Sequence, residues 1–298
     1  MNEIEEKKLL EHIFKEFDYT LYLKNLSAEN VKNEKLKSIA ETFRYNIKSA
    51  LFSIQSLFLI STYTAVKTEI QKDSFRKAIF SDRAIDFEKI TDAFLVDNWE
   101  LLKVNSYKEL IKAINFISKK EVSPLDYINE TNLLFIVNLW SAIEVFIKDY
   151  FIFIINLNPD KSLSKLDDSE YFRKRIRNIT FDEISQLGFD LREKMGYVLL
   201  KDLDFSNFKL IENICEKLII NYKQFPSLLE FKSLNQTRHL VVHKRGIVDQ
   251  KYKDTLNIQN EINTKIQINE SDLKKYLSCL NELLNLLLST EMANEYTF

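Results

Sequence analysis

The sequence predicts an all-α fold, and three observations lead to this prediction. Glycine and proline occur only three times each in 298 residues, against roughly twenty and fifteen expected from average usage of about 7% and 5%. Hairpins, bulges and phosphate-binding loops depend on glycine, so a many-stranded sheet, a dinucleotide-binding fingerprint or a P-loop is close to excluded. Apolar residues recur at helical spacing, and a composition of 45% hydrophobic and 29% charged residues is typical of a packed globular protein.

A stripe of apolar residues predicts the first long helix, because steps of four and three keep its members on one face. These residues are Leu36, Ala40, Phe43, Ile47, Leu51, Ile54 and Phe58. Ser27, just upstream, is the expected N-cap. Weaker helical patterns lie at Glu3–Phe17, Phe87–Leu95 and Tyr107–Ile117.

A domain boundary is predicted between Ser118 and Tyr127, where charged residues gather around Pro124. It separates an N-terminal helical region of unknown role, residues 1–122, from a helical bundle domain, residues 123–298. The bundle domain begins with the segment Asn132–Asn156, which is apolar almost all round. Such a segment is expected to form the central helix of its domain.

The rest of the bundle domain alternates polar segments with helices. A polar stretch over Asn158–Asn178 holds a basic cluster, and a helical pattern follows at Phe208–Tyr222. Pro226 and Gly246 bound a helix of about twenty residues, since proline favours the first turn and glycine the end. A loop is expected over Val248–Asn269. The chain closes with a helix, capped by Asn269 or Ser271, on Leu273, Leu277, Leu280, Leu284 and Leu287.

Two apolar stretches are long enough to be considered as membrane spans. Residues 49–66 carry no charge but seven Ser, Thr or Gln side chains, and the stretch Leu133–Leu157 has Glu144, Lys148 and Asp149 at its centre. A charge at mid-membrane costs several kcal/mol. Both stretches are therefore expected to be buried helices of a protein without a membrane partner.

The chain is expected to be cytoplasmic. Its first ten residues, MNEIEEKKLL, lack the basic start and apolar core of a signal peptide. Cys215 and Cys279 form no metal-ligand or redox spacing, as is usual in a reducing compartment. The formal charge of −2 argues against a surface that coats nucleic acid, but a local basic site is compatible with it.

Two of the three histidines lie on one face of the predicted Pro226–Gly246 helix. His239 and His243 are four residues apart, and Arg238 lies at the edge of the same polar stripe. The other members of the stripe are Lys232, Asn235 and Gln236.

These residue types suit cleavage of RNA without a metal or another cofactor. The reaction needs a base for the 2′-hydroxyl, an acid for the leaving 5′-oxygen and a cation for the phosphorane charge. Imidazoles with an ordinary pKa of about 6.5 can act as base and acid, and guanidinium as the cation.

The same two histidines would also suit a structural role or a metal site. Cations near a helix C-terminus gain about 0.3 to 1 kcal/mol from the helix dipole. Histidines at i and i+4 can also bind zinc, but no Glu stands between them in the HExxH manner, and Arg238 would repel a cation. No metal site is therefore predicted.

The string RHLVVHKRGIVDQKY, Arg238–Tyr252, resembles the signature of the HEPN superfamily: an Arg, four to six residues, then a His. His239 stands where that family usually has a polar residue, an apolar pair precedes His243, and GIVDQKY is similar to a GxxxxxY tail. The segment Leu139–Phe151 looks like the family's first core helix, with Glu144 at its acidic position. The resemblance covers about residues 126–291.

The resemblance implies an all-α bundle of HEPN type with an additional N-terminal helical region. It also implies a homodimer that joins two motifs, and metal-independent endoribonuclease activity in a toxin or phage-defence protein, controlled by an antitoxin or another regulatory protein. Arg238 and His243 would be the catalytic pair, with His239 beside them. One toxin subgroup has a modifiable Tyr two residues after the His; this chain has Arg245, so control by that route is not expected.

Other residues are candidates for supporting roles. Lys244 and Arg245, with Arg173 and Arg175, would contact RNA phosphates, although solvated surface charge explains them equally. Glu144 would either orient Arg238 or pair with Lys148 at i+4. Asn235 belongs to the polar stripe and is a further supporting candidate.

The sequence leaves two functional alternatives to a ribonuclease. A HEPN-like module would bind RNA, nucleotide or protein without cleavage, with Arg238 and His243 holding a phosphate. A helical scaffold would instead use the N-terminal helix around Phe43 and Ile47 to join a larger assembly.

Overall fold

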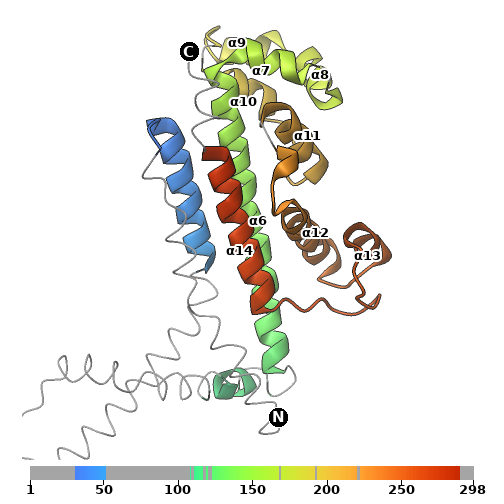
Figure 1. Cartoon of the computed structure of the whole chain (residues 1–298). Helices are drawn as coiled ribbons and strands as arrows, with labels where there is room; N and C mark the ends of the chain where they lie inside the picture. The colour runs from blue at the N-terminus through green and yellow to red at the C-terminus, as the bar shows by residue number, and fades with distance from the viewer. Residues whose placement is uncertain are drawn as a thin grey trace, which may run out of the picture. The chain divides into compact units, whose positions relative to one another are not determined.

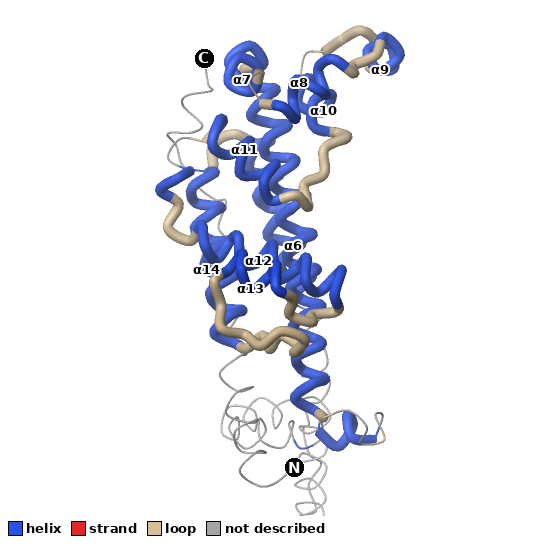
Figure 2. The backbone as a smooth tube through the Cα atoms, turned by 90° about the vertical axis from the view of Figure 1, so that its right-hand side faces the viewer, coloured by secondary structure: helices blue, strands red, loops and turns tan. Residues whose placement is uncertain are grey.

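The computed structural model describes residues 31–51, 108, 111–116, 119, 123–167, 169–191, 193–219 and 222–288. In these residues the regular structure is helical, and an isolated bridge between Ile247 and Lys265 is the sole β pairing. Figure 2 shows this part of the chain as helices and loops without strands. The predicted all-α class is confirmed.

The described residues fall into two compact units. The larger holds residues 31–48, 136–266 and 271–288, and the smaller holds 49–51, 108–135 and 267–270. This division differs from the predicted boundary at 122/123, since the early helix belongs with the C-terminal bundle. The reason is aromatic packing, because Phe43 stacks on Phe146 with ring centroids 4.2 Å apart. Every candidate site residue lies in the larger unit.

Helix α6, Pro124–Leu157, provides the centre of the larger unit through its residues from 136 onward. Trp140, Ile143 and Tyr150 are completely buried, as the apolar pattern predicted. The helix begins earlier than expected. Ser123 Oγ accepts from the Asp126 amide at 3.1 Å, and Pro124 occupies the first turn, where a missing N–H costs nothing.

The predicted early helix is present over residues 34–51, with Leu36, Ala40, Phe43, Ile47 and Leu51 buried. Asn33 caps it in place of Ser27, since its side chain accepts from the Lys35 and Leu36 amides at 3.0 and 3.2 Å. Residues 111–116 of the Tyr107–Ile117 pattern are helical. Ser27, Ile54, Phe58 and the patterns at Glu3–Phe17 and Phe87–Leu95 lie outside the described residues.

Five short helices follow α6. The polar stretch contains α7 (Pro159–Leu166) and α8 (Glu170–Arg177), which the sequence did not predict as helices; then come α9 (Phe181–Gln186), α10 (Met195–Leu200) and α11 (Phe208–Leu218). A 3₁₀ turn, η2, spans Tyr222–Gln224, so α11 ends before the predicted Tyr222.

Helix α10 packs directly on the backbone of α6 at Gly196. A Cβ atom there would lie against the Ile152 carbonyl oxygen and 2.7 Å from the Ile152 Cα. The Gly196 amide donates to Asn156 Oδ1 at 2.7 Å. Glycine is therefore required by the close approach of the two helices.

The predicted Pro226–Gly246 helix is α12, Leu228–Lys244, and is shorter than expected. Pro226 lies in the preceding turn. At the other end Arg245 has φ 53° and Gly246 φ 77°, and the Gly246 amide donates to the Leu240 carbonyl at 3.2 Å. This left-handed pair ends the helix two residues before the predicted bound.

The stretch predicted as a loop contains helix α13, Gln250–Leu256. Asp249 caps it by accepting from the Tyr252 amide at 2.8 Å. The loop prediction was therefore wrong over this segment. The closing helix α14, Glu270–Leu288, matches its prediction, and its five predicted leucines are buried.

Of the described helices, α6 is long and apolar enough to cross a membrane, and 56% of its most apolar stretch is buried inside the protein. The predicted burial of Leu133–Leu157 is confirmed for most of its side chains. Figure 1 shows α12 and α13 on one flank of α6 and the helix of residues 34–51 on another.

Candidate functional site

The two histidines lie side by side on the last turns of α12. Both side chains are exposed, and their ring centroids are 4.3 Å apart at 48°. This proximity follows from their i, i+4 spacing on a regular helix. One chain therefore presents two imidazoles to the same volume of solvent.

Arg238 points from α12 towards α6, where its Nη2 lies 3.5 Å from Glu144 Oε1. The two side chains are 17% and 25% exposed, so the ion pair is largely shielded from water. Lys148 has a different partner, since its Nζ donates to the Lys201 carbonyl at 3.2 Å. Of the two partners that the sequence left open for Glu144, the structure places Arg238 against it.

Burial raises the pKa of Glu144 above its usual value, although the charge of Arg238 opposes this shift and Asp204 adds to it. Burial is also the main cause that lowers the pKa of His239, followed by the charges of His243 and Lys251. A lowered pKa favours the neutral imidazole, which is the form that accepts a proton.

The buried side of α12 is held by a chain of hydroxyl groups. Thr237 Oγ1 lies 2.8 Å from the Tyr252 hydroxyl on α13 and 3.4 Å from the Tyr276 hydroxyl on α14. Ser233 contacts Tyr276 at 3.2 Å. Tyr252, the tyrosine of the GIVDQKY tail, thereby supports the helix that carries both histidines.

Asn235 is not on an exposed stripe. Its side chain is buried and donates to the Ser206 carbonyl at 3.1 Å, while Gln236 donates to Asn235 Oδ1 at 3.2 Å. Asn235 therefore fixes α12 to the turn before α11. Its side chain therefore belongs to the packed side of α12.

The predicted RNA-contacting residues occupy two separate places. Lys244 and Arg245 are exposed at the end of α12, beside His243. Arg173 and Arg175 lie on α8, which Figure 1 shows towards the opposite end of the larger unit from α12. The structure does not bring the four residues into one surface.

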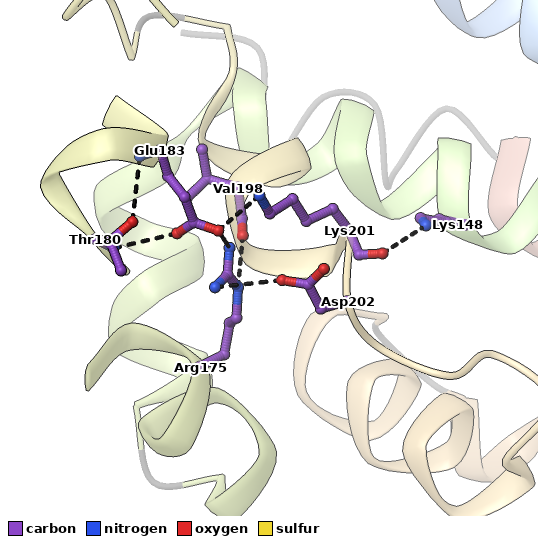
Figure 3. Close-up of polar contacts among 7 residues, drawn as sticks. All are labelled: Lys148, Arg175, Thr180, Glu183, Val198, Lys201 and Asp202. Carbon is purple, nitrogen blue, oxygen red and sulfur yellow. Dashed lines mark hydrogen bonds and ion pairs between the residues drawn. The ribbon is translucent and has the colours of Figure 1, made fainter. Parts of the chain in front are cut away.

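Arg175 is a structural residue and not an exposed cation as predicted. Its Nη2 pairs with Glu183 at 3.0 Å, its Nη1 with Asp202 at 3.3 Å, and its Nε donates to the Val198 carbonyl at 2.9 Å. The side chain is 8% exposed. Figure 3 shows these contacts, together with Lys201, which reaches Glu183 at 2.6 Å. The guanidinium is surrounded because Phe172 and Ile176 place it on the packed face of α8.

A cavity of about 800 Å³ lies between the start of helix 34–51 and the last turns of α6. Ile152, Phe153 and Asp149 line it, and burial raises the pKa of Asp149. None of the predicted site residues lines this cavity. Its shape therefore says nothing about the histidine pair.

Within the described part of the chain, no group of three or more His, Cys, Asp or Glu side chains is placed to hold a metal ion. Lys251, a basic residue that follows the motif closely in the sequence, acts on His239 through its charge. Sequence reasoning missed Asp204, whose charge acts on Glu144. Spacing gave no signal for Asp204, since it comes from a different element.

Comparison of the chain with protein families, with curated proteins and with solved structures gives no match. What the site can do therefore rests on its chemistry: a shielded guanidinium beside two exposed imidazoles, of which that of His239 has a lowered pKa.

Proposed function

We propose that this chain is a metal-independent endoribonuclease of HEPN type that cleaves single-stranded RNA by attack of the 2′-hydroxyl, as a toxin or phage-defence effector. The observation that carries the proposal is the cluster at the end of α12: two imidazoles 4.3 Å apart, next to an arginine that a shielded carboxylate holds in place. Arg238, His239 and His243, which form this cluster, are also the residues of the HEPN-like motif.

Each residue has a role that its surroundings favour. His239, with its lowered pKa, is the base that takes the 2′-hydroxyl proton, and His243 is the acid that protonates the leaving 5′-oxygen. Arg238 binds the scissile phosphate. Its contact with Glu144 uses Nη2, and a guanidinium has five N–H donors in all.

The proposal includes a homodimer in which the α12 ends of the two subunits meet, and both subunits contribute Arg238 and His243 to one site. Lys244 and Arg245, exposed beside His243, would hold flanking phosphates. An antitoxin or another regulatory protein would restrain the activity in the cell.

The test is incubation of the purified protein with labelled single-stranded RNA in excess EDTA. His243→Ala should lower the cleavage rate at least about 100-fold, the usual scale of general acid–base catalysis. Products should end in 2′,3′-cyclic phosphate. Lys275→Ala, which removes an exposed cation from α14, is the matched control and should cleave normally. Full activity in the Arg238→Ala, His243→Ala double variant would refute the proposal.

A second candidate is a HEPN-like module that binds RNA, nucleotide or protein without cleaving. The shielding of Arg238 favours it, since an arginine 17% exposed against a carboxylate also suits a purely structural ion pair. In this case RNA stays intact through long incubation while a gel shift still detects the complex.

A further inference from the structure

A second surface with nucleic-acid chemistry lies on α8 and α9, away from the histidine pair. A pocket of about 330 Å³ is lined there by Glu170, Arg173, Lys174, Arg177 and Asn178. Three cationic side chains thus face one carboxylate, and all are exposed. Among the described residues neither Lys174 nor Arg177 pairs with a carboxylate, and Arg173 Nε donates to the Asp167 carbonyl at 2.8 Å. The pocket therefore offers positive charge to an anion.

Two aromatic rings stand beside this pocket in the chain. Phe181 and Phe189 are 73% and 59% exposed, and their ring centroids are 5.3 Å apart at 55°. Phe181 follows Asn178 by three residues, so their Cα atoms are at most about 11 Å apart. That distance corresponds to about three nucleotides of a stacked strand.

The backbone holds Phe189 in an unfavourable conformation. Gly188 and Phe189 both have positive φ, 67° and 57°, and the Phe189 amide donates to the Ile184 carbonyl at 3.1 Å. A left-handed conformation is disfavoured for a residue that carries a Cβ atom. Exposed rings also forgo the free energy of burial. The turn after α9 thereby holds the Phe189 ring beside that of Phe181.

The contacts in Figure 3 connect α8 and α9 to the rest of the larger unit. Glu183 on α9 pairs with Arg175 on α8 and with Lys201 after α10, and it closes a capping box with Thr180. Lys201 is in turn bound through its carbonyl to Lys148, one helical turn from Glu144 on α6. The phenylalanines and the basic pocket are therefore fixed on the same scaffold as the candidate site.

We infer that α8 and α9 form a second RNA-binding surface, in which Arg173, Lys174 and Arg177 hold phosphates and Phe181 and Phe189 stack on unpaired bases. Positive charge next to aromatic rings is the combination that binds single strands without sequence preference. The inference rests on the proposed function in taking RNA as the ligand. It adds where the strand is held outside the site of cleavage.

The experiment measures binding without cleavage. A fluorescent 2′-O-methyl RNA of mixed sequence cannot react through its 2′-oxygen, and fluorescence anisotropy reports its affinity for the full chain. Phe181→Ala with Phe189→Ala should weaken binding at least about 25-fold, about fivefold for each of the two lost stacking contacts, and Phe181→Tyr should retain it. Tyr45→Ala is the control, because Tyr45 is 69% exposed on the helix of residues 34–51.

The basic pocket has its own readout. Lys174→Ala with Arg177→Ala should reduce the slope of log affinity against log salt by about 1.4, since each phosphate contact on a single strand contributes about 0.7. Lys275→Ala should leave the slope almost unchanged. A duplex of the same sequence should bind more weakly than the single strand, because its bases are already stacked.

Three outcomes separate the inference from the proposed function. Loss of binding in the phenylalanine variant supports the inference even if unmodified RNA is never cleaved, a result that refutes only the nuclease. If all variants bind with equal affinity while the wild type cleaves RNA normally, the inference is overturned and the proposed function is not. Phe181 and Phe189 would then be assigned to contact with a protein partner. No binding by the wild-type chain overturns it as well.

Discussion

The imidazole of His239 has its pKa lowered by burial and by the positive charges of His243, Lys251 and Arg238, which outweigh the carboxylate of Asp249. A base must be unprotonated to act, so the rate of RNA cleavage should fall as the pH drops through a value below the ordinary 6.5. Lys251→Ala removes one of these charges and should move the acidic limb of kcat/KM to higher pH. An unmoved limb would show that a different group is the base.

Glu144 is the only carboxylate that the described residues place against Arg238 as an ion pair. Glu144→Ala would leave the guanidinium shielded and without its ion-pair partner. We expect a loss of about 1 to 3 kcal/mol in the free energy of unfolding, below the 3 to 5 kcal/mol of fully buried pairs. Urea denaturation of this variant beside Glu216→Ala, an exposed position on α11, measures the difference. Equal midpoints would contradict the prediction.

Which arginine of the basic cluster is buried could be predicted in part. Arg175 follows Phe172 by three residues and precedes Ile176, so one helical face holds all three. That face becomes evident only once the polar stretch is recognised as helix α8. The partner of Glu144 could not be chosen from sequence, because Lys148 at i+4 and Arg238 on another helix are equally suitable by charge.

At the level of helices, Glu183 joins α8, α9 and α10. Hydrogen bonds from Lys201 and Arg175 lower the pKa of this carboxyl from 4.5 to about 2. A depressed pKa stabilises the fold above the unfolded value and loses that stabilisation as the pH falls from about 4.5 towards 2.

Glu183→Gln should therefore lower the midpoint of urea unfolding at pH 7 and make it less sensitive to pH between 5 and 3. Urea titrations followed by circular dichroism at pH 7, 5 and 3 would measure these midpoints. Glu193→Gln is a useful comparison, since the pKa of Glu193 is also lowered, by a single exposed contact with Lys35. A parallel pH dependence in wild type and Glu183→Gln would argue against the assigned role.

The long helices were predictable and the short ones were not. α14 and the helix of residues 34–51 have apolar stripes over several turns, and α6 is apolar almost all round, so these patterns are long enough to be recognised. α12 was recognised by Pro226 and Gly246 near its ends. α13 has seven residues and one buried side chain, Tyr252, and is defined chiefly by its Asp249 cap. A single cap residue in a polar stretch does not distinguish a helix from a turn.

At the level of the whole molecule, the proposed nuclease depends on two copies of the α12 end. Light scattering should give twice the chain mass. Adding the inactive Arg238→Ala, His243→Ala chain in excess should lower wild-type activity by more than dilution explains, because mixed dimers contain incomplete sites. Activity that merely scales with the wild-type fraction would mean that each chain acts alone.

Gly196 is a position at which a substitution should make the protein sensitive to temperature. Because α10 lies directly on the α6 backbone there, even a methyl group would push α10 away from α6. The Val198 carbonyl on α10 would then move away from Arg175. Gly196→Ala should consequently yield a temperature-sensitive protein that binds RNA when cold and releases the α8–α9 surface on modest warming, well before α12 unfolds. Hydrogen exchange at a series of temperatures would record the two events separately. The absence of a side chain at residue 196 would then determine the temperature up to which the α8–α9 surface stays folded.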